Sequence, residues 1–209
     1  MHLTLNAEHD RYRWGPITHA PSLLDGDGGF PRTVTDVWDH ADVDEVRREC
    51  RTQLERAVLW GFDATHLDSH LDVLPSRPEF FDVYLELALD FALPLRLPDP
   101  SVERTLGFPV RKLAAEEGAV FPDHVVRVPG PVRPALARLL GDLPPGVTEI
   151  AAAPAIDTPE LRAGFADWPA RVDDHRVLVE EDQLRALVEK AGGHLIGWRP
   201  LRELARAAS

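Results

Sequence analysis

The sequence predicts an α/β fold with mostly parallel strands. Segments with the period of an amphipathic helix alternate along the 209 residues with short segments of strand-like alternation. The nineteen prolines fall between these segments, and we find no internal repeat or low-complexity block. Strands that alternate with helices in this way are typical of a parallel sheet. A chain of this length suits a single domain, residues 1–209.

The N-terminal part combines a short strand with a long irregular segment. Residues 1–6 alternate like a strand. Residues 7–41 are rich in turn-forming and aromatic residues, and a loop of this length in a compact domain is usually functional or disordered. Trp14 is therefore a candidate to stack on a ring of the substrate. The alternative is that Trp14 and Phe30 only attach this loop to the core.

The clearest helix is expected from Val43 to Trp60, with Asp42 as a candidate N-cap and Gly61 just past its end. Apolar residues recur along it at the helical period, which predicts one buried face. The elements expected after it are a short strand over 64–68 that runs into a loop, a helix over 78–91, a strand over 94–98, partly helical structure over 102–117, a helix over 131–140, a strand over 147–152, a helix over 180–191, a strand over 194–198 and a helix over 200–207.

Composition limits the classes of partner. The formal net charge of -12 and the pI of about 5.1 argue against a nucleic-acid or anionic-membrane partner, because the long-range field repels phosphates. Cys50 is the single cysteine, so an intramolecular disulfide is excluded and a reducing cytoplasm fits. The sequence has no run of 18 apolar residues and no leader pattern. We expect a cytoplasmic protein with a neutral or cationic small substrate.

Residues 65–72, Thr-His-Leu-Asp-Ser-His-Leu-Asp, are the densest group of metal-binding side chains in the chain. In a strand, His66 and His70 would lie roughly 13 Å apart, too far to share one ion. Either the chain bends after Asp68 or only one of the two histidines is a ligand. His70, where strand becomes loop, is the stronger candidate. The pattern alone is equally compatible with a polar strand end.

The segment Thr-His-Leu-Asp-Ser-His at 65–70 resembles the signature of the YdjC-like carbohydrate deacetylases, also called the ChbG/HpnK family. Four other stretches match that family in order and spacing. They are His-Leu-Thr-Leu at 2–5, Leu-Arg-Leu-Pro at 95–98, the Glu-to-Pro stretch at 149–154 and Gly-Trp-Arg-Pro-Leu at 197–201. The resemblance covers nearly the whole chain.

The resemblance implies an incomplete, distorted (β/α) TIM-like barrel with mostly parallel strands. It also implies a metal-dependent hydrolase that removes acetyl groups from N-acetylated amino sugars or chitooligosaccharides, with Mg²⁺ or Zn²⁺ as cofactor. The family's N-terminal Asp-Asp pair has no counterpart in these residues, so we expect a chain truncated at its N-terminus relative to the family. A truncated barrel exposes sheet edges, which favours a homodimer.

The resemblance also implies roles for single residues. His2 and His70 match metal ligands of the family. Asp72 stands where the family usually has a histidine, and Asp68 or Asp72 is the candidate to replace the absent aspartate. We expect Asp72 as the third metal ligand and Asp68 and Arg96 as the catalytic residues. Arg96 is also expected to contact the substrate, together with the tryptophan of the N-terminal loop. The alternatives are an exposed histidine at position 2 and a salt bridge from Arg96 to a neighbouring helix.

Ala153 stands where the family has a histidine that donates a proton to the leaving group. His124, His175 and His194 are the candidates to replace it in space. Because alanine cannot exchange a proton, the alternative to an active deacetylase is a catalytically impaired relative that binds a carbohydrate or a protein partner. A metal hydrolase of different specificity is a further alternative.

Overall fold

The computed structural model describes the chain except residues 11, 129, 180 and 209 and the side chains of residues 181–183 and 208. The chain divides into two compact units, residues 1–121 with 198–209, and residues 122–197. That the two units form a single domain stays a prediction. Among the described residues, no helix has the length and apolar character needed to cross a membrane.

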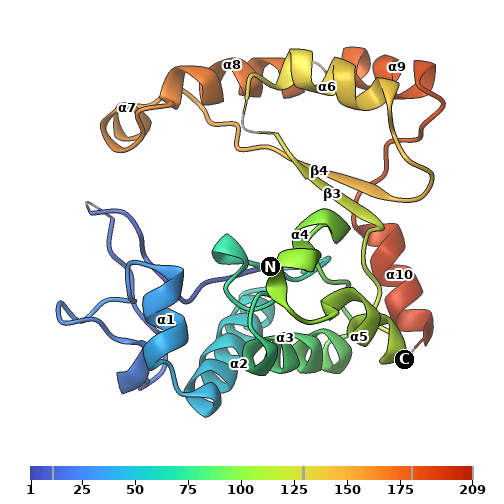
Figure 1. Ribbon diagram of the computed structural model, residues 1–209. Coiled ribbons are helices and arrows are strands. Elements are labelled where there is room, and N and C mark those ends of the chain that lie inside the picture. The colour runs from blue at the N-terminus through green and yellow to red at the C-terminus, as the bar shows by residue number, and fades with distance from the viewer. Residues whose placement is uncertain (11, 129, 180, 209) are drawn as a thin grey trace. The chain divides into compact units, whose positions relative to one another are not determined.

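The first unit carries most of the helices and the N-terminal strand (Figure 1). Its elements are β1 (His2–Leu3), the 3-10 helix η1 (Pro21–Leu23), α1 (Val34–His40), α2 (Val43–Leu59), β2 (Asp68–Ser69), the 3-10 helix η2 (His70–Asp72), α3 (Pro78–Asp90), α4 (Pro100–Leu106), α5 (Val110–Glu116) and α10 (Arg199–Ala208). The second unit comprises β3 (His124–Arg127), α6 (Val132–Gly141), β4 (Thr148–Ala151), α7 (Pro159–Gly164), α8 (Trp168–Val179) and α9 (Glu181–Lys190).

The strands pair in parallel in both units, which confirms the predicted α/β fold. β1 pairs with β2, with His2 opposite Asp68, and an isolated parallel bridge joins Leu67 to Leu95. β3 pairs with β4 in the second unit. The strands of the described residues make two two-stranded sheets, so closure into a barrel stays a prediction.

Helix α2 begins and ends where the sequence predicts. The side chain of Asp42 accepts hydrogen bonds from the backbone N–H groups of Asp44 and Glu45, as an N-cap should. The helix packs against α3, which lies beside it (Figure 1). The buried apolar side chains of both helices belong to the core of the first unit.

Several side chains of α2 bond to backbone outside the helix, among them Gln53 and Glu49. The side-chain amide of Gln53 accepts from the N–H of Thr4 at 3.1 Å and donates to its carbonyl oxygen at 2.8 Å. The buried carboxylate of Glu49 accepts from the N–H groups of Ile17 and Thr18 at 3.0 and 2.8 Å. These bonds attach the N-terminal segment to α2.

Several expectations about secondary structure are wrong. Residues 7–41 are not irregular throughout, since they contain η1 and α1, and Thr33 caps α1 by accepting from the N–H of Asp36 at 3.0 Å. The strand expected over 194–198 is absent from the described residues: Leu195 and Ile196 are about half exposed, and Trp198 directly precedes α10. Alternation predicts a strand only where a neighbouring strand pairs with it.

The sequence did not indicate β3, α7 or α8. The expected helices over 78–91 and 131–140 and the strand over 147–152 correspond to α3, α6 and β4 within a residue or two. The expected helix over 180–191 corresponds to α9, although residue 180 itself lies outside the described residues.

Candidate functional site

The pairing of β1 with β2 places His2 beside Asp68. The chain then bends directly after β2 into η2, where Leu71 and Asp72 adopt positive φ angles of 50° and 55°. Such angles are uncommon for residues other than glycine. This bend brings His70 to the ring of His2 instead of continuing the strand.

Four side chains form a continuous hydrogen-bonded row, which we call the His2–His70 cluster: Asp68, His2, His70 and Glu8. Asp68 Oδ2 lies 2.6 Å from His2 Nδ1. The other ring nitrogen of His2, Nε2, lies 2.9 Å from His70 Nδ1. His70 Nε2 lies 2.9 Å from Glu8 Oε2. The row therefore has two imidazoles at its centre and a carboxylate at each end.

Arg96 extends this row from the strand-like segment that follows α3. Its Nη1 donates to Asp68 Oδ2 at 2.7 Å. The hydroxyl of buried Tyr84 on α3 lies 2.8 Å from the carbonyl oxygen of Leu67 and 3.2 Å from that of Arg96. Tyr84 thus holds together the two chain segments that carry Asp68 and Arg96.

Both carboxylates of the cluster are ionised near neutral pH. Burial raises the pKa of Asp68. The hydrogen bond with His2 and the positive charge of Arg96 lower it by more than burial raises it, so the pKa of Asp68 lies below its usual value. Burial also raises the pKa of Glu8, and the hydrogen bond with His70 outweighs this effect and lowers it. Ionised carboxylates only accept hydrogen bonds.

The tautomer of each imidazole follows from these carboxylates. We assign the proton of His2 to Nδ1, which donates to Asp68, and the proton of His70 to Nε2, which donates to Glu8. His2 Nε2 and His70 Nδ1 lie 2.9 Å apart, a hydrogen bond that requires one further proton on this pair of nitrogens.

The two facing nitrogens fit part of a divalent metal site. Two imidazole nitrogens on one tetrahedral Zn²⁺ ion are separated by about 3.3–3.4 Å, given Zn–N distances of about 2.0–2.1 Å, so the two rings would have to move slightly apart to share an ion. A histidine ligand commonly donates its other ring N–H to a carboxylate, as His2 and His70 do here. Within the described part of the chain, however, no three His, Cys, Asp or Glu side chains are grouped so that they could hold a metal ion.

The structure thus brings four of the predicted site residues together, namely His2, His70, Asp68 and Arg96. Asp72 lies in η2 two residues after His70, without completing a three-residue metal group with the histidines. His66 is directed elsewhere: its ring stacks on that of Trp198, with centroids 4.1 Å apart.

Trp14 lies beside the His2–His70 cluster and attaches to the core, as one of its two interpretations predicts, whereas stacking on a substrate ring stays a prediction. Its ring centroid lies 6.3 Å from that of His70, and its Nε1 donates to the carbonyl oxygen of Asn6 at 3.0 Å. It also packs against the core of the first unit. Ala153 lies in the second unit, whereas the His2–His70 cluster lies in the first. The three histidines that could replace a histidine at position 153, namely His124, His175 and His194, also lie in the second unit.

Glu8 is the site residue that sequence reasoning missed. The strand-like alternation continues past residue 6: Leu3, Leu5 and Ala7 are buried in the core. Even-numbered positions therefore face the opposite side, which is the side of His2. Following the alternation for two more residues would have placed Glu8 on the same side as His2.

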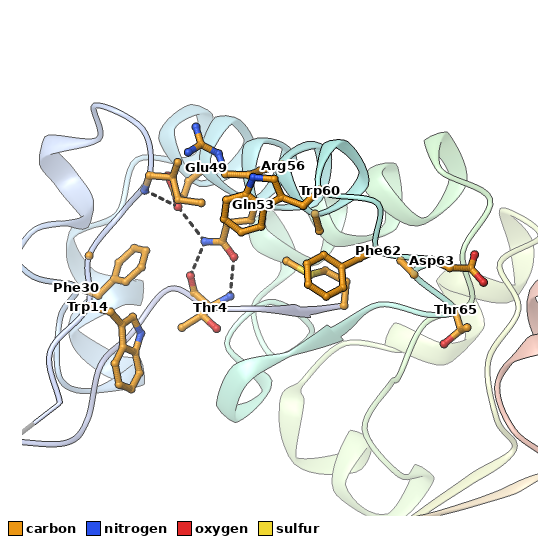
Figure 2. A pocket seen from close by; sticks show the side chains of 15 residues that line it. Thr4, Trp14, Phe30, Glu49, Gln53, Arg56, Trp60, Phe62, Asp63 and Thr65 are labelled. Carbon is orange, nitrogen blue, oxygen red and sulfur yellow. Dashed lines mark hydrogen bonds between the residues drawn. The ribbon is translucent and has the colours of Figure 1, made fainter. Parts of the chain in front are cut away.

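The cavity shown in Figure 2 has a volume of about 520 Å³ and does not include the His2–His70 cluster. Trp14 lines it, together with apolar side chains that include Trp60 and Phe62. The polar groups of Glu49 and Gln53 in its wall are already bonded to each other and to backbone. The other ionisable side chains of its wall are Arg56 and Asp63, and neither belongs to the His2–His70 cluster.

Comparisons with known proteins agree with one another. Residues 1–190 match the family model described as YdjC-like protein. A carbohydrate deacetylase of Thermus thermophilus is 36% identical over 211 residues, which cover 97% of this chain and 77% of that protein. A carbohydrate deacetylase of Thermoanaerobacter pseudethanolicus is 28% identical over 189 residues, covering 88% of this chain and 70% of that protein.

A solved structure from Enterococcus faecalis, named as a candidate cellobiose-phosphate cleavage protein, supports the fold. It superposes with a TM-score of 0.76 at 22% identity, covering 96% of this chain and 76% of that one. The family model and the identity to the Thermus protein extend over most of the chain. This chain therefore belongs to the YdjC-like protein family.

Proposed function

We propose that this protein is a metal-dependent hydrolase that removes acetyl groups from N-acetylated amino sugars or chitooligosaccharides. The observation that carries the proposal is the pair of imidazole nitrogens 2.9 Å apart, each ring backed by a carboxylate. The carbohydrate deacetylases among its relatives give the class of substrate.

We propose His2 and His70 as ligands of a divalent ion, Zn²⁺ or Mg²⁺. Asp72 is in the same turn as His70 and stays the predicted third ligand, although it is not grouped with the two histidines in this structure. Such an ion polarises an amide carbonyl and lowers the pKa of a bound water molecule. The carboxylates of Glu8 and Asp68 hold the two rings with their metal-facing nitrogens unprotonated.

Asp68 acts in this proposal through His2. Its side chain is only 9% exposed, and one oxygen, Oδ2, accepts hydrogen bonds from both His2 and Arg96. A carboxylate held in this way fixes the ring of His2 and balances the charge of Arg96. The predicted contact of Arg96 with substrate, and a more direct catalytic part for Asp68, stay predictions.

The N-terminal loop provides the proposed sugar-binding side of the site. Trp14 is partly exposed and lies edge-on to the ring of His70. An indole ring offers a flat apolar surface for the C–H face of a pyranose ring, which suits a neutral carbohydrate. The net charge of -12 argues for the same class of substrate, because it disfavours anionic partners.

Acetate release from N-acetylated chitooligosaccharides, with Mg²⁺ and Zn²⁺ supplied in turn, tests the proposal. We expect release by the wild-type protein and by His40→Ala, an exposed histidine on α1, and at least a hundredfold loss in His70→Ala. Equal release by wild type and His70→Ala would refute the proposed site.

The alternative is a catalytically impaired relative that binds a carbohydrate or a protein partner. It is favoured by the lack of a three-residue metal group among the described side chains. Binding of chitooligosaccharide without acetate release, at any metal concentration, would support it. A screen of other amides and esters would then identify a hydrolase of different specificity.

Three further predictions accompany this function. We propose that the parallel strands belong to an incomplete (β/α) barrel, which the parallel pairing of every described strand supports. We also propose a cytoplasmic location, since the single cysteine, Cys50, is buried and reduced. A homodimer remains the proposed assembly.

A further inference from the structure

We propose that the cavity of Figure 2 binds a small apolar carboxylate, a molecule with an apolar body and a single carboxylate group. The proposal does not depend on the proposed hydrolase activity, because the cavity does not include the His2–His70 cluster. Its volume of about 520 Å³ lies within the range of about 300–1,000 Å³ that is usual for small-molecule sites. The wall has aromatic rings for the apolar body and Arg56 for the carboxylate.

Four aromatic rings line the cavity, those of Trp14, Phe30, Trp60 and Phe62. Figure 2 shows Trp14 and Phe30 on one side of the view and Trp60 and Phe62 nearer its centre. Phe30 is buried in the core, whereas Trp60 and Phe62 are 70% and 65% exposed. Large apolar side chains that are exposed together commonly mark a binding surface. An apolar ligand between the rings would remove part of this surface from water.

The polar groups of the inner wall are already hydrogen-bonded. The two oxygens of the Glu49 carboxylate accept from the N–H groups of Ile17 and Thr18. The side-chain amide of Gln53 bonds to both main-chain groups of Thr4 and to Glu49. A molecule with many hydroxyl groups would leave these hydroxyls without partners here, so the part that enters the cavity has to be apolar.

The charged side chains of the wall favour one anionic group on the ligand. The charge of Asp63 is balanced, because its carboxylate bonds to the guanidinium groups of Arg199 and Arg202. Among the side chains that the structure describes, no carboxylate pairs with Arg56, whose guanidinium carbon lies 6.0 Å from the ring centroid of Trp60. Arg56 is exposed in the last turn of α2. A guanidinium can bind a carboxylate through two parallel N–H···O bonds, so the carboxylate of the ligand belongs at Arg56.

The net charge of -12 does not prevent such a ligand from binding. Exposed charges separated by more than about 8 Å are largely screened from each other at physiological ionic strength. At contact distance the guanidinium of Arg56 therefore has a stronger effect than the remote carboxylates. A ligand with one negative charge is also repelled less than a polyanion such as a nucleic acid.

Isothermal titration calorimetry with octanoate tests the proposal, and 1-octanol serves as an uncharged probe of the same length. We expect saturable binding of octanoate, about two- to fivefold tighter than that of octanol. Trp60→Ala should weaken the binding of both probes about tenfold, because the apolar body loses one ring. Arg56→Gln should weaken octanoate about two- to fivefold and leave octanol within about twofold.

Two variants of exposed side chains outside the cavity are the matched controls. Leu59→Ala removes a side chain that is 85% exposed, one residue before Trp60. Arg104→Gln removes an exposed arginine from α4. Both should keep the wild-type affinity for octanoate within about twofold. If Trp60→Ala lowers the melting temperature, Phe62→Ala repeats the measurement at the second exposed ring.

A second readout locates the bound molecule in wild-type protein. In ¹H–¹⁵N NMR spectra, octanoate should shift the indole N–H signals of Trp14 and Trp60 more than those of the other three tryptophans. Larger shifts at the other three would overturn the proposal, because the probe would then bind outside the cavity.

Wild-type protein that shows no saturable binding of octanoate would overturn the proposal. Equal affinity for octanoate and octanol would also overturn it, since Arg56 would then contribute nothing. If octanoate does not bind and sedimentation shows an association that Trp60→Ala abolishes, the rings contact a second copy of the chain and the proposal is wrong. Octanoate binding in a protein that releases no acetate would support this proposal and refute only the proposed deacetylase activity.

Discussion

Replacing His66 with phenylalanine should remove a loss of stability that the wild-type protein suffers in mildly acidic solution. The ring of His66 stacks on Trp198, with 4.1 Å between centroids and 12° between planes. Burial, reinforced by the positive charge of the Met1 amine, lowers its pKa from 6.5 to about 4. Phenylalanine keeps an aromatic ring against Trp198 and cannot bind a proton.

The sign follows from proton linkage. Between pH 6.5 and about 4 the unfolded chain binds a proton at His66 that the folded protein does not bind. The free energy of unfolding therefore falls as the pH is lowered through this range. The full shift corresponds to an upper limit of about 3 kcal/mol. Because the ring is partly exposed, solvent screening reduces the expected loss between pH 7 and pH 5 to about 1–2 kcal/mol.

Urea unfolding of wild type and His66→Phe at pH 7 and pH 5 measures this loss. We expect the free energy of unfolding of wild type to fall by about 1–2 kcal/mol more than that of the variant. Carboxylates with lowered pKa values, such as Asp68 and Glu8, lose their contribution at lower pH and affect both proteins alike. Parallel behaviour of the two proteins would refute the burial argument for His66.

Three other substitutions or treatments test the first unit. Tyr84→Phe should cost about 1–2 kcal/mol in urea unfolding, because the buried carbonyl oxygen of Leu67 loses its hydroxyl partner; a cost near zero would contradict this. Arg202→Ala should cost about 1–3 kcal/mol, since this buried guanidinium ties α10 to Asp63 and, at 2.9 Å, to the carbonyl oxygen of Ala64; the exposed Arg206→Ala is the control. Cys50, whose pKa is raised by burial and by Glu49, should react with a thiol reagent only after unfolding, and rapid reaction in the folded state would refute its burial.

Local signals in the sequence were sufficient for the regular elements. Asp42 caps α2, and Pro78 opens α3 at the first helical position, where its missing N–H costs nothing. Both signals act within a few residues, so they could be read without knowing the fold. The capping side chain of Thr33 was also present, but the helix after it, Val34–His40, is too short to show a clear apolar stripe.

The candidate site could be predicted only in part, because its assembly is non-local. His2 and His70 were identified from short motifs, whereas their contact depends on the pairing of β1 with β2 and on the bend at Leu71 and Asp72. Positive φ angles at these two residues have no signature in the sequence, since neither is glycine. The contribution of Glu8 required the additional knowledge that the alternation of β1 continues beyond its assigned end.

The bonds between Gln53 and Thr4 have a consequence for self-association. A side-chain amide presents a carbonyl oxygen and an N–H group in nearly the spacing of a peptide group, so Gln53 occupies the hydrogen-bonding positions that a neighbouring strand would use at Thr4, while its second N–H bonds to Glu49. A strand from another molecule must first displace it. Gln53 thus satisfies the N–H and C=O groups of Thr4 at this strand edge. Its replacement by leucine would remove this partner and allow both main-chain groups to pair with a strand of another molecule.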